Sequence, residues 1–372
     1  MKVSINMKKV RIGIIGTGVG IRTHLNAFRL IEDAEVVAIC GSSLKRSQEF
    51  AEKHGISVAC IDYKELCDNQ EIDLICVTSP NRFHCDAVKY AVKKEKHIIC
   101  EKPLSDNAQE VHEMVNTVKN YSKITVVDHQ LRFNPYINKI KEFITNGTLG
   151  DIFTVKLNQQ GTGFANPDAK WTWSFDGNQG GGVRLAMASH FNDLIQFWFG
   201  ERNVVGINAY LNPVTKTRKD SNGTPHEVTA STICNANISL DDELNIVYSI
   251  NAGSYMGSIF GIEIFGSKAE LTFSLDGKLA IYLRDSVGKK QPILVDGVFE
   301  DERENKISIF SGSFRYFAHL LIKAIQTGDR RDIAQAATFD DALYNIKLLD
   351  AIQQSANTYS CIALGKKNSQ YV

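Results

Sequence analysis

The sequence predicts an α/β protein that begins with a doubly wound parallel sheet and continues with an α+β part containing a large, mainly antiparallel open sheet. Three observations lead to this prediction. The first third of the chain alternates short apolar runs with amphipathic helical patterns, and its first apolar run leads directly into a glycine-rich turn. Beyond residue 127 the pattern changes to longer runs of period two joined by Gly, Asp and Asn turns.

The apolar runs of the first third are nearly continuous, as expected of strands that helices cover on both faces. They lie at 10–15, 35–40, 74–78, 97–100 and 124–127. Helical patterns between them complete right-handed βαβ units. The later strands are predicted at 152–157, 228–238, 244–250, 259–265, 271–275 and 279–283. Two helices, at 314–327 and 339–356, close the chain.

The glycine-rich turn "GTGVGIRTH" follows the first predicted strand and opens a helix. Gly16 and Gly18, with Thr17 and Val19, suit the tight turn and close backbone approach that a pyrophosphate needs. The third glycine of the usual pattern is displaced, because Ile21 stands at its place and Gly20 precedes it. The context predicts a Rossmann dinucleotide-binding domain over 7–127, with the alternative of an ordinary glycine turn.

Residues 128–372 are predicted to form a substrate-binding and oligomerisation domain, and its closing helix is a candidate to pack back on the Rossmann domain. At the end of the second strand, "CGSSLKR" lacks the acidic residue that holds the ribose of NAD. The two hydroxyls of Ser42 and Ser43 and the two cations Lys45 and Arg46 suit a 2′-phosphate instead, so NADP is the preferred cofactor and NAD the other possibility. Two solvated surface charges are the alternative explanation of the cations.

Lys102 in "HIICEKPL" is the main catalytic candidate. Pro103 keeps the residue before it out of helical space, so Lys102 is expected to be extended at the carboxyl end of the fourth predicted strand of the sheet. Open parallel sheets bind their ligands at this edge. The alternative is a solvated lysine at the end of a strand.

Composition excludes several classes of function. The 42 basic and 42 acidic residues cancel, and no basic run is interleaved with aromatic residues, which disfavours a nucleic-acid surface. No apolar stretch has the length of a membrane span, and the N-terminus does not read as a signal peptide, so a cytoplasmic protein is expected. The eight cysteines form no CxxC pair, so we expect no metal site and no disulfide framework.

The order of these motifs resembles the glucose-fructose oxidoreductase, inositol dehydrogenase and rhizopine-catabolism (Gfo/Idh/MocA) family. The resemblance extends over nearly the whole chain and includes "GTGVG" with His24, "SPNRFH", "EKP", "RFNP", "GGGVRLAMASHFNDL", "FGSKAEL" and "FDDALYNIKLLDAI". It implies an N-terminal Rossmann domain and a C-terminal α/β domain whose open sheet faces a partner subunit in a homodimer or homotetramer. It also implies substrates that are sugars, cyclitols or nucleotide-linked sugars.

The resemblance also implies roles for single residues. Lys102, with Glu101 before it, corresponds to the lysine beside the nicotinamide, and His190 corresponds to the catalytic histidine. The cofactor is expected to be lined by the loop after the third of the five predicted strands and by a polar residue near the carboxamide, that is by Ser79, Pro80, Asn81, His84 and Gln130. The sequence departs from the family at Ala186, where an aspartate is common, and at Ala188, where a glycine is common.

Four further residues are weaker substrate candidates. Arg132 and Arg184 suit an anionic group, Trp173 suits the face of a sugar ring, and Asp193 suits the orientation of His190. Salt bridges, burial and helix structure explain them equally well. The leading function is an NAD(P)-dependent oxidoreductase that moves a hydride between nicotinamide and a secondary alcohol or ketone.

Two alternatives remain: a catalytically weakened dinucleotide-binding regulatory protein, which Ala186 favours, and an NAD-dependent redox glycosidase. The sequence leaves open which sugar is the substrate, the direction of the reaction, the choice between NAD and NADP, and the choice between dimer and tetramer.

Overall fold

A computed structural model describes residues 8–241, 243–275, 278–304 and 306–364 of the protein. The chain divides into two compact units. The first comprises the chain up to Asn134 and the later segment Ile307–Leu343, and the second comprises Pro135–Lys306 and the chain from Tyr344 on. The domain limits of 7–127 and 128–372, which concern separate binding and assembly roles, stay a prediction.

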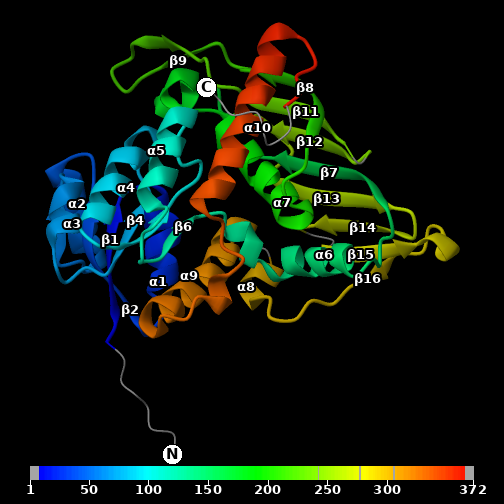
Figure 1. The fold of residues 1–372 in the computed structure, drawn as a ribbon. Helices are drawn as coiled ribbons and strands as arrows, with labels where there is room; N and C mark the ends of the chain where they lie inside the picture. Colours follow the sequence, from blue (N-terminus) through cyan, green and yellow to red (C-terminus); the bar gives the residue numbers. More distant parts are fainter. Residues whose placement is uncertain (1–7, 242, 276–277, 305, 365–372) are drawn as a thin grey trace, which may run out of the picture. The chain divides into compact units, whose positions relative to one another are not determined.

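The first unit contains a six-stranded parallel sheet of order β3-β2-β1-β4-β5-β6 (Figure 1). Its strands are β1 Val10–Ile15, β2 Ala34–Cys40, β3 Val58–Cys60, β4 Leu74–Val77, β5 His97–Cys100 and β6 Thr125–Val127. The predicted doubly wound sheet is thereby confirmed. Strand β3 was not among the predicted strands. The strand order reverses between β1 and β4, which is the position where open α/β sheets bind ligands.

Helices cover both faces of this sheet. They are α1 Asn26–Phe28, α2 Leu44–His54, α3 Tyr63–Asp68, α4 His84–Lys93, α5 Ala108–Val118 and α9 Ile309–Thr327. The side chains of α1, α2 and α9 share a core with one face of the sheet, in which Phe28, Phe314 and Phe317 are fully buried. Helix α9 begins five residues before its predicted start, because the Ser308 hydroxyl accepts a hydrogen bond from the amide of Ser311 and caps the first turn.

The second unit contains an eight-stranded sheet of order β16-β15-β14-β13-β7-β12-β11-β8. Only β7 and β12 pair in parallel, so the predicted mainly antiparallel sheet is confirmed. Its strands are β7 Ile152–Gln160, β8 Val204–Asn212, β11 Ile233–Leu240, β12 Asn245–Asn251, β13 Ile259–Gly266, β14 Ala269–Ser274, β15 Lys278–Leu283 and β16 Gln291–Pro292. A separate hairpin pairs β9 Thr217–Lys219 with β10 Pro225–Glu227.

The prediction of one strand over 228–238 is wrong, because β11 begins only at Ile233. The preceding residues keep a strand-like composition, but the amides of Thr229 and Ala230 donate to the carbonyl of Phe175 in a loop and not to a neighbouring strand. The residue types of a segment indicate whether it suits a half-buried sheet surface, but they do not indicate which groups form hydrogen bonds with its backbone.

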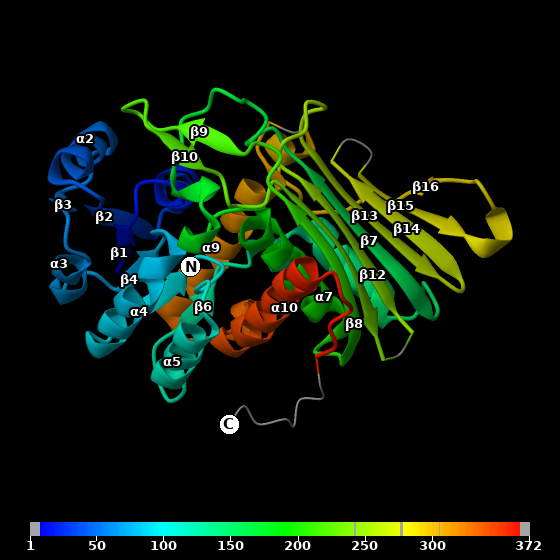
Figure 2. The ribbon, with the colours of Figure 1, turned by 90° about the horizontal axis from the view of Figure 1, so that it is seen from above.

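The helices of the second unit are α6 Pro135–Thr145, α7 Ser189–Phe199, α8 Glu300–Arg303 and α10 Phe339–Thr358, of which α10 begins in the first unit. Figure 2 shows α7 and α10 against one face of the large sheet, while the opposite face carries no helix among the described residues of this unit. Burial alternates along β11, where Cys234, Ala236 and Ile238 point inward and Asn235 and Asn237 point outward.

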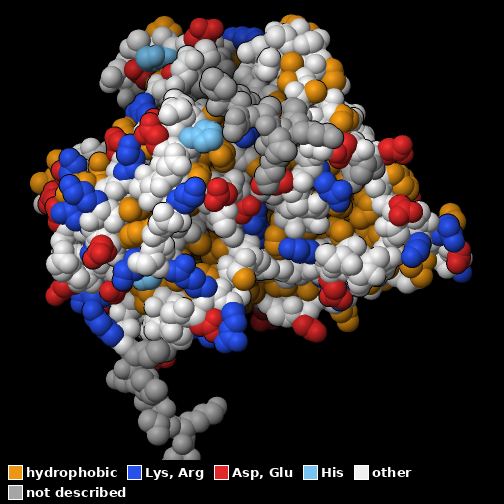
Figure 3. Space-filling view, in the orientation of Figure 1, with side chains coloured by type: hydrophobic (Ala, Val, Ile, Leu, Met, Phe, Trp, Pro, Cys, Tyr) orange, Lys and Arg blue, Asp and Glu red, His pale blue; other side chains and the backbone are white. Residues whose placement is uncertain are grey.

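On the face shown in Figure 3, Lys and Arg side chains are interspersed with Asp and Glu side chains, in keeping with the balanced composition.

Within the described ranges, none of the helices combines the length and the apolar character that a membrane crossing requires.

Candidate functional site

The glycine turn lies between β1 and the first helix and packs directly against the end of β4. Gly16 has a φ of +120°, and a Cβ atom there would lie 2.5 Å from the carbonyl oxygen of Thr78. A Cβ at Gly20 would lie 2.4 Å from the hydroxyl oxygen of Thr78, whereas one at Gly18 would meet no atom within 4 Å. Gly20 therefore provides the close packing usually given by the third glycine, and Gly18 leaves the outer side of the turn open to a ligand.

The turn continues into a wide π-type segment, Gly20–Leu25, before α1. Thr17 and Val19 are partly exposed on the turn, and Val19 already has helical backbone angles. Segments of π type are rare and recur at functional sites. The predicted cofactor residues of this turn therefore come together at the switch point of the sheet.

The end of β2 carries the groups predicted to select the dinucleotide. Ser43 caps α2, since its hydroxyl oxygen accepts a hydrogen bond of 3.3 Å from the amide of Arg46. Ser42 remains exposed, and the Lys45 side chain is 87% exposed with its ammonium 4.0 Å from Glu49. Lys45 and Arg46 thus lie on the first turn of α2, where cations are not otherwise favoured.

A buried histidine joins the loop after β4 to the loop after β5. His84 Nε2 lies 2.8 Å from the carbonyl oxygen of Ser79, and its Nδ1 lies 3.2 Å from the carbonyl oxygen of Leu104. Burial lowers the pKa of His84, so a neutral ring donates to one of these carbonyls at a time. The loop also contains Pro80 and the buried Asn81. The predicted lining residues of this loop are therefore held beside the end of β5.

Among the buried polar atoms at the carboxyl edge of the sheet that have no hydrogen-bond partner among the described residues, two belong to predicted cofactor residues. They are the hydroxyl oxygen of Ser79 and the amide oxygen of Gln130. Gln130 lies just after β6 and is 5% exposed. Because buried polar atoms are nearly always hydrogen bonded, these two atoms fit an edge that receives a polar ligand such as a nicotinamide carboxamide.

Lys102 follows β5 directly and is partly buried beside two carboxylates. Its amide donates to Glu101 Oε2 at 3.3 Å, and the Lys102–Pro103 peptide is cis, which the sequence did not indicate. Burial lowers the pKa of Lys102, and the charges of Glu101 and Asp128 oppose this effect. A lowered pKa increases the fraction of Lys102 that is neutral and able to accept a proton.

The carboxylates of Glu101 and Asp128 share a partner in His24, a residue of the π-type segment. His24 Nε2 lies 3.1 Å from Glu101 Oε1 and 3.1 Å from Asp128 Oδ2, and only the Glu101 contact has the direction of a hydrogen bond. His24 and Asp128 are completely buried, and Glu101 is 7% exposed. We call these three residues the buried triad.

Burial and mutual contact shift the pKa values of the triad in different directions. Burial pulls the pKa of His24 down, but Asp128, Cys76 and Glu101 outweigh it and hold the pKa well above its ordinary value. Burial and the charge of Glu101 raise the pKa of Asp128 to about 7. Burial raises the pKa of Glu101, but the hydrogen bond with His24 outweighs it and lowers that pKa. The triad therefore holds a charged His24–Glu101 pair and an Asp128 that titrates near neutral pH.

Arg132, a weaker substrate candidate, forms hydrogen bonds and an ion pair with residues of the first unit. It is 6% exposed, and its Nη1 donates to Asp341 Oδ2 at 3.2 Å and to the carbonyl oxygen of Gln335 at 3.3 Å. These contacts join the segment after β6 to the start of α10. A salt bridge accordingly accounts for the burial of Arg132.

His190 lies in the second unit, near the start of α7, where it is 4% exposed. The helix around it is held by a buried amide network. Asn345 Nδ2 donates to the carbonyl oxygen of Ser189 at 2.7 Å, and the Tyr248 hydroxyl donates to Asn192 Oδ1 at 3.0 Å. Asp193 is also buried in α7, at 1% exposed. His190 and Asp193 therefore project from a helix that is fixed on both sides.

The segment before α7 explains the glycines that precede His190. Gly182 has a φ of +93°, and a Cβ atom there would lie 2.8 Å from the amide of Ser231. It leads into a second π-type segment, Arg184–Ala188. Ala186 lies in this wider segment and is exposed, so a spacing of four residues from His190 is less than one full turn there.

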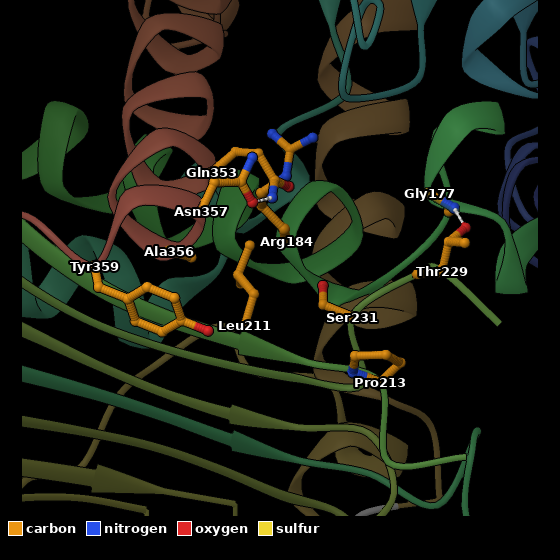
Figure 4. A pocket seen from close by; sticks show the side chains of 12 residues that line it. Gly177, Arg184, Leu211, Pro213, Thr229, Ser231, Gln353, Ala356, Asn357 and Tyr359 are labelled. Carbon is orange, nitrogen blue, oxygen red and sulfur yellow. Dashed lines mark hydrogen bonds between the residues drawn. The ribbon is translucent and has the colours of Figure 1, made fainter. Parts of the chain in front are cut away.

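Arg184 lines an open pocket of about 400 Å³ in the second unit (Figure 4). Its Nη1 donates to the carbonyl oxygen of Leu349 at 3.1 Å and lies 3.9 Å from Asp350, both on α10. Polar groups of Thr229, Ser231, Gln353 and Asn357 also line the pocket. Arg184 is therefore joined to α10, and the pocket walls come from α10, β8 and the loop before β11.

The loop before the glycines carries the tryptophans. Trp171 Nε1 donates to the carbonyl oxygen of Glu227, and its ring stacks on His226 at 4.6 Å, so Trp171 fixes the hairpin β9–β10. Trp173 is 40% exposed. The same loop is held by Arg218, which is 3% exposed and donates to the carbonyl oxygens of Phe164, Asn166, Pro167 and Ala169.

Sequence reasoning missed the buried triad. His24 was noted only as part of a motif, and Asp128 was not chosen as a site candidate. Because acidic residues are rarely buried, an aspartate directly after a strand that is predicted to be buried could have indicated a functional residue. Their contact could not be read from the sequence, since His24 and Glu101 are 77 residues apart.

Comparison with known proteins assigns the fold and the family. A family profile described as an oxidoreductase family with an NAD-binding Rossmann fold matches residues 10–129, and its companion, described as the C-terminal alpha/beta domain, matches residues 141–364. The chain belongs to the Gfo/Idh/MocA family. It is therefore an oxidoreductase with an NAD-binding Rossmann fold, and the predicted resemblance is confirmed.

Curated relatives are similar over part of their length. The D-glucoside 3-dehydrogenase of Escherichia coli is 29% identical over 56% of this chain and 60% of its own. The myo-inositol 2-dehydrogenase of Thermotoga maritima is 31% identical over 52% of this chain and 55% of its own. The chain thus aligns with little more than half of each of these two proteins.

Among solved structures, a levoglucosan dehydrogenase in complex with NADH and levoglucosan superposes with a TM-score of 0.84, with 20% identity over 96% of this chain and 100% of that one. This likeness shows that the whole described fold is common to both proteins.

Proposed function

We propose that this oxidoreductase transfers a hydride between nicotinamide and a secondary alcohol or ketone of a sugar, a cyclitol or a nucleotide-linked sugar. The observation that carries the proposal is the position of Lys102, whose pKa is lowered by burial at the carboxyl edge of an NAD-binding Rossmann sheet. The names of the relatives, a glucoside dehydrogenase and an inositol dehydrogenase, support a substrate rich in hydroxyl groups.

The residues at the switch point would hold the cofactor. Gly16, Thr17, Gly18 and Val19 would receive the pyrophosphate, for which the open outer side of Gly18 leaves room. Ser79 and Gln130 would bind the carboxamide through their buried oxygens, which fits their lack of other partners among the described residues. The loop positions expected beside the nicotinamide are Pro80, Asn81, His84 and Glu101.

Bound NAD(P) would supply the acceptor or donor of the hydride. The chain's own task is to move the proton of the substrate hydroxyl. In the direction of alcohol oxidation, the hydroxyl proton of the substrate would pass to Lys102 Nζ as the hydride leaves the same carbon. The lowered pKa of Lys102 increases the neutral fraction that can accept this proton.

His190 would position the substrate hydroxyl, with Lys102 as the main proton acceptor. Ala186 supports this division, because the carboxylate common at that position would otherwise orient the histidine. Asp193, from the same fixed helix, is the candidate to orient His190 instead. Trp173, Arg184 and Arg132 stay weaker candidates for substrate contact, and the engagement of both arginines with α10 favours a structural role for them.

NADP is the proposed preferred cofactor. The exposed cations Lys45 and Arg46 on the first turn of α2, together with Ser42, suit a 2′-phosphate. The use of Ser43 as the helix cap removes one hydroxyl from this set, so the two cations carry the preference.

The proposal is tested by the pair of wild type and Lys102→Ala. A thermal-shift screen with NAD, NADP and a panel of sugars, cyclitols and nucleotide sugars first identifies a substrate, since specific ligands stabilise the folded state. Lys102→Ala should then lower kcat by roughly 10² or more and change the dinucleotide Kd by no more than a few-fold. Undiminished turnover in the variant would remove Lys102 from the mechanism.

Two other functions give different results in the same experiment. Release of a leaving group from a glycoside without net reduction of the cofactor would identify a redox glycosidase. Binding of the dinucleotide without turnover of any member of the panel would favour a regulatory protein.

We also propose a homodimer or homotetramer formed through the outer face of the large sheet. Support comes from the helix-free face and from Tyr210 on β8, which is 49% exposed and pairs with the outward Asn235. Light scattering on wild type and on Asn237→Lys, which places a charge on that face, tests it. A monomeric wild type would refute the proposal.

A cytoplasmic location is proposed as well, supported by eight free thiols, seven of them buried.

A further inference from the structure

The buried triad is a group of charges that binding of a dinucleotide alone does not require. A buried ionised carboxylate is costly unless it is paired and hydrogen bonded. Yet Asp128 is completely buried, and neither of its oxygens has a hydrogen-bond partner among the described residues. His24 Nε2 lies 3.1 Å from Asp128 Oδ2.

The ring of His24 is fixed by apolar neighbours and not by solvent. Its centroid lies 4.0 Å from that of Phe314 on α9 and 6.3 Å from that of Phe28 on α1. Both phenylalanines are fully buried in the core of the first unit. Rotation of the ring away from the carboxylates is therefore opposed by close packing.

Several other titratable groups of the first unit face the triad and Lys102. These groups are Cys76 on β4, His84 at the start of α4, Cys100 on β5, and His129 after β6, with Arg132 and Asp341 acting on His129. Burial raises the pKa of both thiols and lowers the pKa of His84 and of His129, so these four groups stay neutral near pH 7. The charge that varies beside Lys102 is consequently that of Asp128.

We propose that His24 and Asp128 are positioning residues that act on Lys102. The triad holds one proton on His24, and the charge on Asp128 sets the affinity of the Lys102 amine for its proton. His24 and Glu101 cancel each other's charge. Ionised Asp128 then favours the ammonium form of Lys102, and protonated Asp128 does not. This inference rests on the proposed role of Lys102 in proton transfer.

In the oxidation direction, the triad neither gains nor loses a proton during the chemical step. The proton leaves the substrate hydroxyl and binds Lys102 Nζ, whose charge becomes +1, and ionised Asp128 stabilises that charge. Ionised Asp128 also increases the fraction of Lys102 that is protonated before the substrate binds and that cannot then accept a proton. Asp128 therefore shifts the pH at which Lys102 is an effective base.

The same three donor atoms lie within 4.8 Å of one another, a spacing that a divalent cation also accepts. A proton explains the arrangement better for two reasons. The His24–Glu101 contact already has hydrogen-bond geometry, and the ammonium of Lys102 nearby opposes a second positive charge.

The first test compares the pH dependence of kcat/KM in wild type and Asp128→Asn, with the substrate that the ligand panel identifies. The variant removes a negative charge beside Lys102, so the acidic limb should move to lower pH by about one unit. Cys100→Ala is the matched control, because this neutral side chain is buried at the end of β5, which pairs with the strand β6 that Asp128 follows, and the acidic limb of this variant should not move. An unchanged limb in Asp128→Asn would overturn the proposal.

The second test needs no substrate. Histidine-selective ¹⁵N labelling of the wild type, with the signal of His24 assigned from its loss in His24→Gln or from contacts with Phe314, reports the protonation of each ring. One histidine should remain protonated at pH 8. Titration of His24 near 6.5 would overturn the proposal, as would a stoichiometric divalent metal found by elemental analysis.

The proposed role of Lys102 and the proposed role of the buried triad can be refuted independently. Full turnover in Lys102→Ala refutes the proposed role of Lys102, whatever Asp128→Asn does. Loss of turnover in Lys102→Ala together with coincident pH profiles of wild type and Asp128→Asn refutes only the role of the triad.

Discussion

Replacing Asp128 with asparagine should change how the stability of the first unit depends on pH. Burial and Glu101 raise the pKa of Asp128 to about 7 from its ordinary 3.8. A group whose pKa is raised by folding contributes stability that is complete below its unfolded pKa and is lost as the pH rises through its folded pKa. The loss for Asp128 therefore extends from about pH 4 to pH 7, and asparagine, which does not titrate, avoids it.

The size of the effect follows from the same values. Between pH 5 and the folded pKa of Asp128, about 7, the wild-type protein loses about 1.4 kcal/mol of its free energy of unfolding for each of about two pH units. This gives a limit of about 3 kcal/mol. Reorientation of nearby dipoles returns part of it, so Asp128→Asn should gain about 2 kcal/mol relative to wild type on going from pH 5 to pH 8.

Urea unfolding at pH 5 and pH 8 measures this difference. The chain's three tryptophans, Trp171, Trp173 and Trp198, all lie in the second unit, so their fluorescence follows that unit, whereas far-UV circular dichroism follows both. Asp106→Asn, a partly exposed carboxyl in the loop after β5, is the control and should show no such pH-dependent gain. An Asp128→Asn variant that is destabilised equally at both pH values, or more at pH 8, would refute the reasoning.

Three further predictions concern the cofactor, the proton transfer and the second unit. Fluorescence titration should show tighter binding of NADPH than of NADH, and Lys45→Ala combined with Arg46→Ala should narrow the gap; equal affinities in the wild type would contradict the assignment. His190→Asn should lower kcat/KM less than Lys102→Ala does, whereas a larger loss, with the limb near neutral pH abolished, would make His190 the base. Arg218→Leu removes the guanidinium that donates to four carbonyls and should destabilise the second unit by about 3 kcal/mol or more in tryptophan-monitored unfolding, which an unchanged midpoint would disprove.

The strands and helices with a clear local period were predictable. β1 and β5 were found within their observed bounds, because residues buried on both faces give continuous apolar runs. β3 and β16 were not among the predicted strands. The long β8 was also missed, because Asn208 and Gly206 interrupt its apolar alternation while its pairing with β11 supplies the stability.

The candidate site was predictable where it depends on strand ends. Lys102 and Gln130 come directly after predicted strands, and parallel strands bring their carboxyl ends to one edge of a sheet. The function of Gly20 was not predictable, because it follows from the distance to Thr78, which lies directly after β4 and 58 positions later in the chain. The use of Ser43 as a helix cap likewise depends on where α2 begins.

The sequence by itself determined the order of the elements, the glycine turn and the position of Lys102 before Pro103, because these depend on residues that are close together in the chain. Only the tertiary structure decided that α9 completes the core of the first unit and that His24, Glu101 and Asp128 form one buried triad. The reason is physical. Periodicity and propensity act over a few residues, whereas the pKa of a buried group depends on every charge and dipole that folding brings within a few ångströms of it.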